Sequence, residues 1–315
     1  MKFTHNTSNL AKILAIILVI TGHYSGFLGI DNLYVANSGA VGVGIFLFVS
    51  AYGLSASMEQ GDEQLQTFWV RILNLVIVYE FATLLKAIIS IVFFKESVAV
   101  SVKALVGLGF KSNLDPTMWY MFYIIMVYIV FWISHLLIQS ELCRVGLIFI
   151  SCSVFAVLSS YIVIPFAFPL GYLAFLFKNK SRFFYLIVLS TLFLGLILAY
   201  QSFFILPITH TNLLLLLQVS YLPIFSLYFI EWGQRLILKK HFIGIVKTLS
   251  SFTLGLYLFE GFPLYNSRLA ELVHSNLLFA IPLVLCFVVL ISYFYTVLII
   301  NRFSNKNLKK GLYKE

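Results

Sequence analysis

Charged residues are scarce in this chain. Asp, Glu, Lys and Arg together make up 10% of its 315 residues, whereas a soluble globular domain carries about a quarter. Hydrophobic residues make up 61%, and the mean hydropathy is +0.99. This composition excludes an ordinary soluble domain and indicates an integral membrane protein that crosses the bilayer several times.

Cysteine is also scarce. The three cysteines, Cys143, Cys152 and Cys286, are scattered in or beside apolar runs. Their number and spacing exclude a disulfide framework, a cysteine zinc site and a haem attachment motif. We therefore expect no metal centre.

Acidic residues are fewer than basic ones, which leaves a formal net charge of +9. The basic residues lie mainly in loops on one predicted side of the bilayer and in the tail at 302–315, as the positive-inside rule requires. The excess is therefore a topology signal, and we expect no nucleic-acid partner. Both termini are predicted to be cytoplasmic, which requires an even number of spans.

About ten apolar runs have the length of membrane helices or parts of them. They cover roughly residues 10–29, 37–57, 70–94, 117–138, 145–162, 163–178, 183–205, 212–230, 247–265 and 277–301. The run at 163–178 is short and contains Pro165 and Pro169, so we expect a kinked or partial span. We predict an all-α polytopic membrane bundle in one domain, 1–315, with the bundle at 10–301 and a basic cytoplasmic tail at 302–315.

Two further observations concern the first apolar run and the longest loop. The first run has no small-residue cleavage site after it, so it is interpreted as a retained helix rather than a signal peptide. The longest loop, about 95–116, is predicted to lie outside and is mildly amphipathic. A helix lying on the surface is the simpler interpretation, and a contact with a partner or acceptor is the alternative.

Lys12 and His23 stand out in the first apolar run. Eleven residues on an α-helix return to nearly the same direction, so both lie on one face, about 16 Å apart along the axis. A histidine within a membrane helix is costly unless it has a partner or a task. Near neutral pH an imidazole can take a proton from a hydroxyl and return it to a leaving group. The alternative is a histidine that only packs against a neighbouring helix.

Other polar residues interrupt the apolar runs. Glu80, Lys86 and Glu260 each need a partner or a polar cavity. Arg71 stands at the predicted inner end of its helix, where it either extends toward the interface or binds an anion. Ser50 offers a hydroxyl in the middle of a span.

Five motifs along the chain follow patterns that occur together in one known protein family. The first is a basic residue, ten residues and a histidine, met here by Lys12 and His23. The second is Gly-Val-x-x-Phe leading to Ser-Gly-aromatic, met by Gly42, Val43, Phe46, Ser50 and Tyr52, with Ala51 in place of the glycine. The third is a basic pair three residues apart, where Arg71 matches and Asn74 takes the second place. The fourth is the aromatic pair Trp119 and Tyr120. The fifth is Ser-x-Gly-x-Tyr-Leu before a histidine, met loosely around Tyr257, with Glu260 near the histidine's usual place.

In their residues and order, these five motifs resemble acyltransferase family 3, a family of integral membrane proteins. The resemblance implies ten helices and transfer of an acyl group, mostly acetyl, from cytoplasmic acyl-CoA to an envelope glycan. It implies that the donor lies near Lys12, Arg71, Asn74 and Ser50, and the acceptor near Trp119, Tyr120 and Tyr257. We also predict that Glu80, as an ionisable residue within an apolar run, binds the acceptor. We predict His23 and Glu260 as the catalytic residues. We also predict that the protein lies in the plasma membrane. Glu260 has three possible roles: orienting His23, binding a sugar hydroxyl, or pairing with Lys86.

Two other classes of function remain open at this point. A transporter or flippase of a polysaccharide precursor also needs ionisable residues inside the bilayer. A purely structural membrane subunit has less reason to keep them. The oligomeric state is left open by the sequence.

Overall fold

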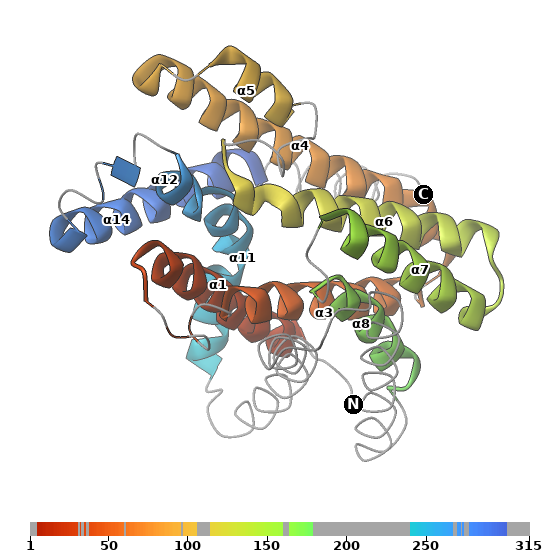
Figure 1. Ribbon diagram of the computed structural model, residues 1–315. Helices are drawn as coiled ribbons and strands as arrows, with labels where there is room; N and C mark the ends of the chain where they lie inside the picture. Colours follow the sequence, from red (N-terminus) through yellow and green to blue (C-terminus); the bar gives the residue numbers. More distant parts are fainter. Residues whose placement is uncertain are drawn as a thin grey trace. The chain divides into compact units, whose positions relative to one another are not determined.

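The computed structural model describes residues 5–30, 38–59, 61–95, 97–105, 114–159, 164–178, 240–266 and 277–300, with a few single positions between them. These residues are nearly all helical, and no strand occurs among them (Figure 1). The predicted all-α class is therefore confirmed for the described part of the chain. Two of the predicted spans, 183–205 and 212–230, and the basic tail lie outside it.

Six of the described helical segments are long and apolar enough to cross a membrane. They are built on α1 (His5–Phe27), α3 (Ser38–Met58), α4 (Asp62–Phe94), α6 (Trp119–Leu137), α11 (Lys240–Glu260) and α14 (Leu277–Tyr295). Each coincides with a predicted apolar run. The total of ten spans and the cytoplasmic termini stay predictions.

The run predicted at 145–162 forms α7 (Glu141–Ser159), which is not among the six. The run at 163–178 forms the 3-10 turn η4 (Ile164–Phe166) and the short α8 (Ala167–Leu176). Its length agrees with the expected partial span, because α8 has only 10 residues. In the 95–116 loop, a short helix α5 (Val98–Lys103) begins after Ser97, whose side chain accepts a hydrogen bond from the Ala99 amide.

The chain divides into two compact units. The first comprises residues 1–22, 31–64 and 133–250, and the second comprises 23–30, 65–132 and 251–315. In the first unit the core is formed by α3, α8 and the N-terminal part of α1, with Ala15, Ile45, Phe48 and Leu170 buried together. Helices α3 and α8 approach closely here because Gly171 of α8 has no side chain. A Cβ at this position would collide with the backbone of Phe48 in α3.

The second unit contains most of α4, α6 and α14, the C-terminal part of α11, the turn η3 (Pro116–Met118) and α12 (Phe262–Tyr265). Helix α6 packs on α4, where the Phe131 ring lies 5.8 Å from the Phe68 ring. Helix α14 packs on α11, where the Tyr295 ring lies 5.1 Å from the Phe259 ring. The five-residue π-helical turn η5 (Thr296–Ile300) follows α14 directly.

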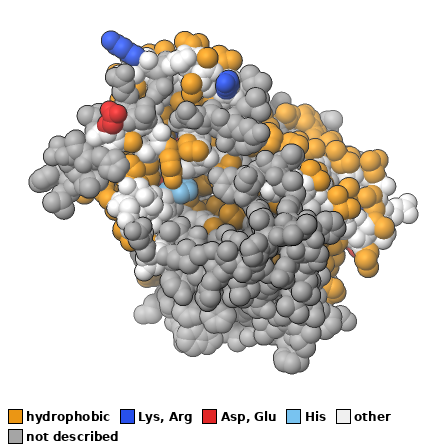
Figure 2. Space-filling model, in the orientation of Figure 1, with side chains coloured by type: hydrophobic (Ala, Val, Ile, Leu, Met, Phe, Trp, Pro, Cys, Tyr) orange, Lys and Arg blue, Asp and Glu red, His pale blue; other side chains and the backbone are white. Residues whose placement is uncertain are grey.

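Large hydrophobic side chains cover much of the described surface. Figure 2 shows them over the described part of one face, with few charged side chains among them. Phe93 and Leu283 are each more than 70% exposed. An apolar surface of this kind marks contact with lipid or with another apolar partner, and with six helices of membrane length it indicates an integral membrane protein.

Candidate active site

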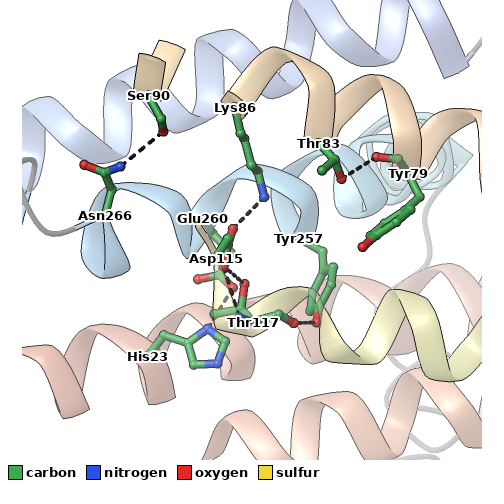
Figure 3. A network of polar contacts seen from close by, with 10 residues as sticks. All are labelled: His23, Tyr79, Thr83, Lys86, Ser90, Asp115, Thr117, Tyr257, Glu260 and Asn266. Atoms are coloured by element: carbon green, nitrogen blue, oxygen red, sulfur yellow. Dashed lines mark hydrogen bonds and ion pairs between the residues drawn. The ribbon is translucent and has the colours of Figure 1, made fainter. Parts of the chain in front are cut away.

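His23 and Glu260 lie in hydrogen-bond contact, although 237 residues separate them in the chain. The imidazole Nδ1 is 2.7 Å from Glu260 Oε1. His23 lies in the last part of α1, and Glu260 is the last residue of α11; both belong to the second unit (Figure 3). The structure thus brings together the two residues that the sequence predicted as catalytic.

The two side chains differ in accessibility. Glu260 is completely buried, whereas His23 keeps 22% of its side chain exposed. Of the two, only His23 is accessible to a substrate. The second carboxylate oxygen of Glu260, Oε2, is buried without a hydrogen-bond partner among the described residues. This arrangement is typical of a carboxylate that orients an imidazole, whose other nitrogen is then available for proton transfer.

A buried ion pair lies close to this site. Lys86 Nζ of α4 is 2.5 Å from Asp115 Oδ2, and both side chains are at most 2% exposed. The other carboxylate oxygen, Oδ1, accepts hydrogen bonds from the Thr117 amide at 3.0 Å and from the Thr117 hydroxyl at 2.6 Å. A buried ion pair is tolerated when its remaining hydrogen-bonding groups are satisfied in this way. Lys86 therefore pairs with Asp115, in contrast to the predicted alternative of a Lys86–Glu260 pair.

Aromatic residues lie around the polar groups; Trp119, Tyr120 and Tyr257 are buried, whereas Tyr265 is 40% exposed. The Tyr257 hydroxyl of α11 donates a hydrogen bond to the Thr117 carbonyl, and the Tyr120 ring lies edge-on to Tyr257 at 4.9 Å. The Trp119 ring contacts Tyr120 at 6.4 Å. The Tyr265 ring lies edge-on to His23 at 6.1 Å. Of the predicted acceptor residues, the structure thus brings Trp119, Tyr120 and Tyr257 together.

The chain bends directly after Glu260. Helix α11 ends there, Gly261 precedes α12, and Pro263 stands at the start of the new helix. A Cβ added at Gly261 would collide with the Thr117 side chain and would lie 2.9 Å from Asp115 Oδ1. The position therefore needs glycine because of close packing, which brings the residue beside Glu260 against the Asp115 carboxylate.

Gly261→Ala is expected to lower the stability of the folded protein. An added methyl group in a packed interior costs about 1–3 kcal/mol, because neighbouring groups must shift. The measurement is the midpoint of thermal unfolding of the purified protein in detergent. Gly244→Ala is the matched control, since Gly244 lies in the same helix and a Cβ there meets open space. Equal midpoints for the two variants would contradict this account of Gly261.

The predicted donor residues are distributed over both units. Arg71 and Asn74 are partly buried in α4, and the Arg71 guanidinium lies 6.0 Å from the Phe68 ring. Arg71 precedes Lys86 by fifteen residues, which is about 22 Å along a helix. Lys12 of α1 and Ser50 of α3 are partly buried in the first unit. Their roles toward the donor stay predictions.

Glu80 is half-buried in α4. It is outside the network drawn in Figure 3, and its role toward the acceptor also stays a prediction. Among the described residues, no group of three or more His, Cys, Asp or Glu side chains is arranged to hold a metal ion.

Asp115 and Thr117 are the site residues that sequence reasoning missed. Asp115 precedes Pro116 and an apolar run, a pattern typical of a helix N-terminus. That local signal was available, and the Asp115 side chain does accept from the amide of Thr117. Its pairing with Lys86 depends on packing and had no signal in the sequence.

Comparison with known proteins supports the resemblance seen in the sequence. The model of the acyltransferase domain of family 3 matches residues 6–297, which contain four of the six segments of membrane length completely and nearly all of the first and the last. Searches of curated proteins and of solved structures each gave no significant match. Because the match spans nearly the whole chain and includes the His23–Glu260 site, the chain belongs to acyltransferase family 3, as an integral membrane acyltransferase.

Proposed function

We propose that this protein is an O-acyltransferase that moves an acetyl or other short acyl group from acyl-CoA to a hydroxyl of an extracytoplasmic glycan. The observation that carries the proposal is the contact of the accessible His23 with the fully buried Glu260. In an acyltransferase, such a pair can act as a general base, His23, and the carboxylate that orients it, Glu260. The family match also favours acyl transfer over the transporter interpretation.

The pair suggests a specific route for the proton. With Nδ1–H donating to Glu260 Oε1, the lone pair of His23 Nε2 accepts the proton of the acceptor hydroxyl. The hydroxyl oxygen then forms a bond to the thioester carbonyl carbon, and the carbon–sulfur bond breaks. The imidazolium returns the proton to the leaving thiolate, so that the products are the ester and the free thiol of CoA and His23 is neutral again. The carboxylate stabilises the imidazolium while it exists.

A membrane location suits this reaction, because acyl-CoA is charged and does not cross the bilayer, whereas the acceptor is outside. We propose ten spans with both termini in the cytoplasm, in the plasma membrane, on the basis of the basic residues in predicted inner loops. Lys12, Arg71, Asn74 and Ser50 would bind the donor. Trp119, Tyr120, Tyr257 and Glu80 would bind the acceptor.

Transfer of labelled acetyl from acetyl-CoA to glycan tests the function. Membranes from cells that express the protein are expected to move the label into the glycan fraction. Membranes that lack the protein provide the background. If the expressed protein left the glycan at background while it moved unmodified glycan precursor across the membrane, the transporter interpretation would replace this one.

Arg71→Ala is expected to weaken donor binding. Loss of one charge-assisted hydrogen bond to a phosphate costs about 1.5–3 kcal/mol, which corresponds to an increase in KM for acyl-CoA of roughly 10- to 100-fold. Lys12→Arg is expected to be tolerated, because both side chains are cationic. Arg144→Ala is the control, since Arg144 pairs with Glu141 in the first unit. A change confined to the KM of the acceptor would show that the assignment of Arg71 is wrong.

A further inference from the structure

The residues on both sides of Glu260 are held by the Lys86–Asp115 ion pair and its partner Thr117. The Tyr257 hydroxyl, three residues before Glu260, donates to the Thr117 carbonyl. The Phe259 ring lies 5.7 Å from Lys86 Nζ. Gly261 packs so closely on Thr117 and Asp115 that it has no space for a Cβ. The backbone that carries Glu260 is therefore fixed before and after this residue by one buried polar group.

A second contact ties the same bend to α4. The Asn266 amide, just after α12, donates to the Ser90 hydroxyl at 3.2 Å. Ser90 lies one helical turn after Lys86, so α4 holds the chain at two successive turns (Figure 3). Thr83, one turn before Lys86 on the same helix, instead bonds to the carbonyl of Tyr79 at 2.9 Å.

Charge balance links the ion pair to His23 and Glu260. Lys86 and Asp115 together are neutral, and an ionised Glu260 beside a neutral imidazole adds one negative charge. When His23 takes a proton, all four side chains together become neutral. In a buried setting, charges without compensation are costly. Lys86 supplies the compensating positive charge of this cluster, and Tyr257 and Tyr265 are in contact with its members. Tyr24 interacts electrostatically with Glu260, and Tyr79 with Asp115.

We propose that Lys86 and Asp115 are positioning residues for acyl transfer: their ion pair holds the α11–α12 bend so that Glu260 keeps His23 oriented toward the substrate. This inference rests on the proposed function. Neither residue needs to touch the substrate, because both act through the backbone around Glu260. A displacement of about 1 Å at a catalytic group costs on the order of 100-fold in rate.

The test is the uncharged double variant Lys86→Met/Asp115→Asn in the full-length protein. Asn at 115 can still accept the two hydrogen bonds from Thr117, and Met at 86 leaves no unpaired buried charge. The cost to stability is then confined to the amide N–H groups of the asparagine introduced at 115, which face the methionine without an acceptor. We expect kcat to fall on the order of 100-fold, with the KM for acyl-CoA within about threefold and an altered pH profile. Lys86→Arg, which keeps the cation, is expected to retain much of the activity and the wild-type pH profile.

The matched controls are Thr83→Val and a second uncharged form, Lys86→Gln/Asp115→Asn, which keeps a hydrogen bond between the two side chains. Whichever double variant accumulates in membranes at the wild-type level is the one measured. Wild-type kcat and pH profile in that variant would overturn the positioning role and leave the proposed function intact. The same loss of kcat in Thr83→Val would also overturn it, since any change in this part of α4 would then lower the rate, whether or not it removes the ion pair. Absence of transfer by the wild-type protein would overturn the proposed function and, with it, this inference.

Discussion

His23→Ala is expected to abolish acyl transfer while the protein still accumulates in the membrane. A positioned general base contributes typically 10²- to 10⁴-fold to a rate, so we expect transfer to fall by at least about 100-fold. Removal of the partly exposed imidazole leaves the buried Glu260 without its hydrogen-bond partner. A buried carboxyl group relieves this cost by taking up a proton, so the fold should persist. The measurement is the acyl content of the glycan at matched amounts of membrane protein.

His5→Ala is the matched control for this variant. His5 is exposed and lies at the start of the same helix, α1. It is expected to transfer acyl groups at the wild-type rate. Near-normal acylation in His23→Ala would instead show that His23 is a packing residue, as the alternative interpretation of the sequence has it.

Glu260→Gln is expected to have the second-largest effect. Glutamine keeps the size of the side chain and can still accept from His23 Nδ1, but it removes the negative charge that stabilises the imidazolium. When a carboxylate beside a catalytic imidazole becomes an amide, the loss can reach about 10⁴-fold. We expect kcat to fall by roughly 10²- to 10⁴-fold for every acceptor, with an altered pH profile.

The kinetic pattern of Glu260→Gln separates its possible roles. If Glu260 bound a sugar hydroxyl, the KM of the acceptor would rise while kcat changed little. The contact between Glu260 Oε1 and His23 Nδ1 favours the orienting role. Glu141→Gln is the control, because Glu141 also accepts hydrogen bonds, from Arg144 and Tyr172, but lies in the first unit. An unchanged Glu260→Gln enzyme would remove Glu260 from the active site.

Local signals account for the part of the fold that sequence reasoning predicted. The described helices of membrane length coincide with predicted apolar runs, because a helix in lipid must satisfy its own backbone and expose apolar side chains. The short, proline-interrupted run ending at 178 was predicted for the same reason and forms η4 and α8. These properties depend on composition and on neighbours within a few residues.

In the candidate site, the sequence predicts the ionisable residues but not how they pair. His23 and Glu260 each stand out because an ionisable group in an apolar run is costly, and both were predicted as catalytic. Three partners of Glu260 were nevertheless compatible with the sequence. The structure selects His23 for Glu260 and Asp115 for Lys86. Asp115 itself, in a predicted loop, gave only the local signal of a helix start.

The sequence by itself determined that this is an all-α membrane protein of acyltransferase family 3 with ionisable side chains inside its helices. Helix length, apolar content and motif order are local properties that a single chain displays directly. The tertiary structure alone decided which buried charge meets which, and that the bend at Gly261 joins Glu260 to the Lys86–Asp115 pair. The physical reason is that such pairing depends on how helices pack at close distance, and residues 237 apart in the chain have no local interaction through which the sequence could indicate their contact.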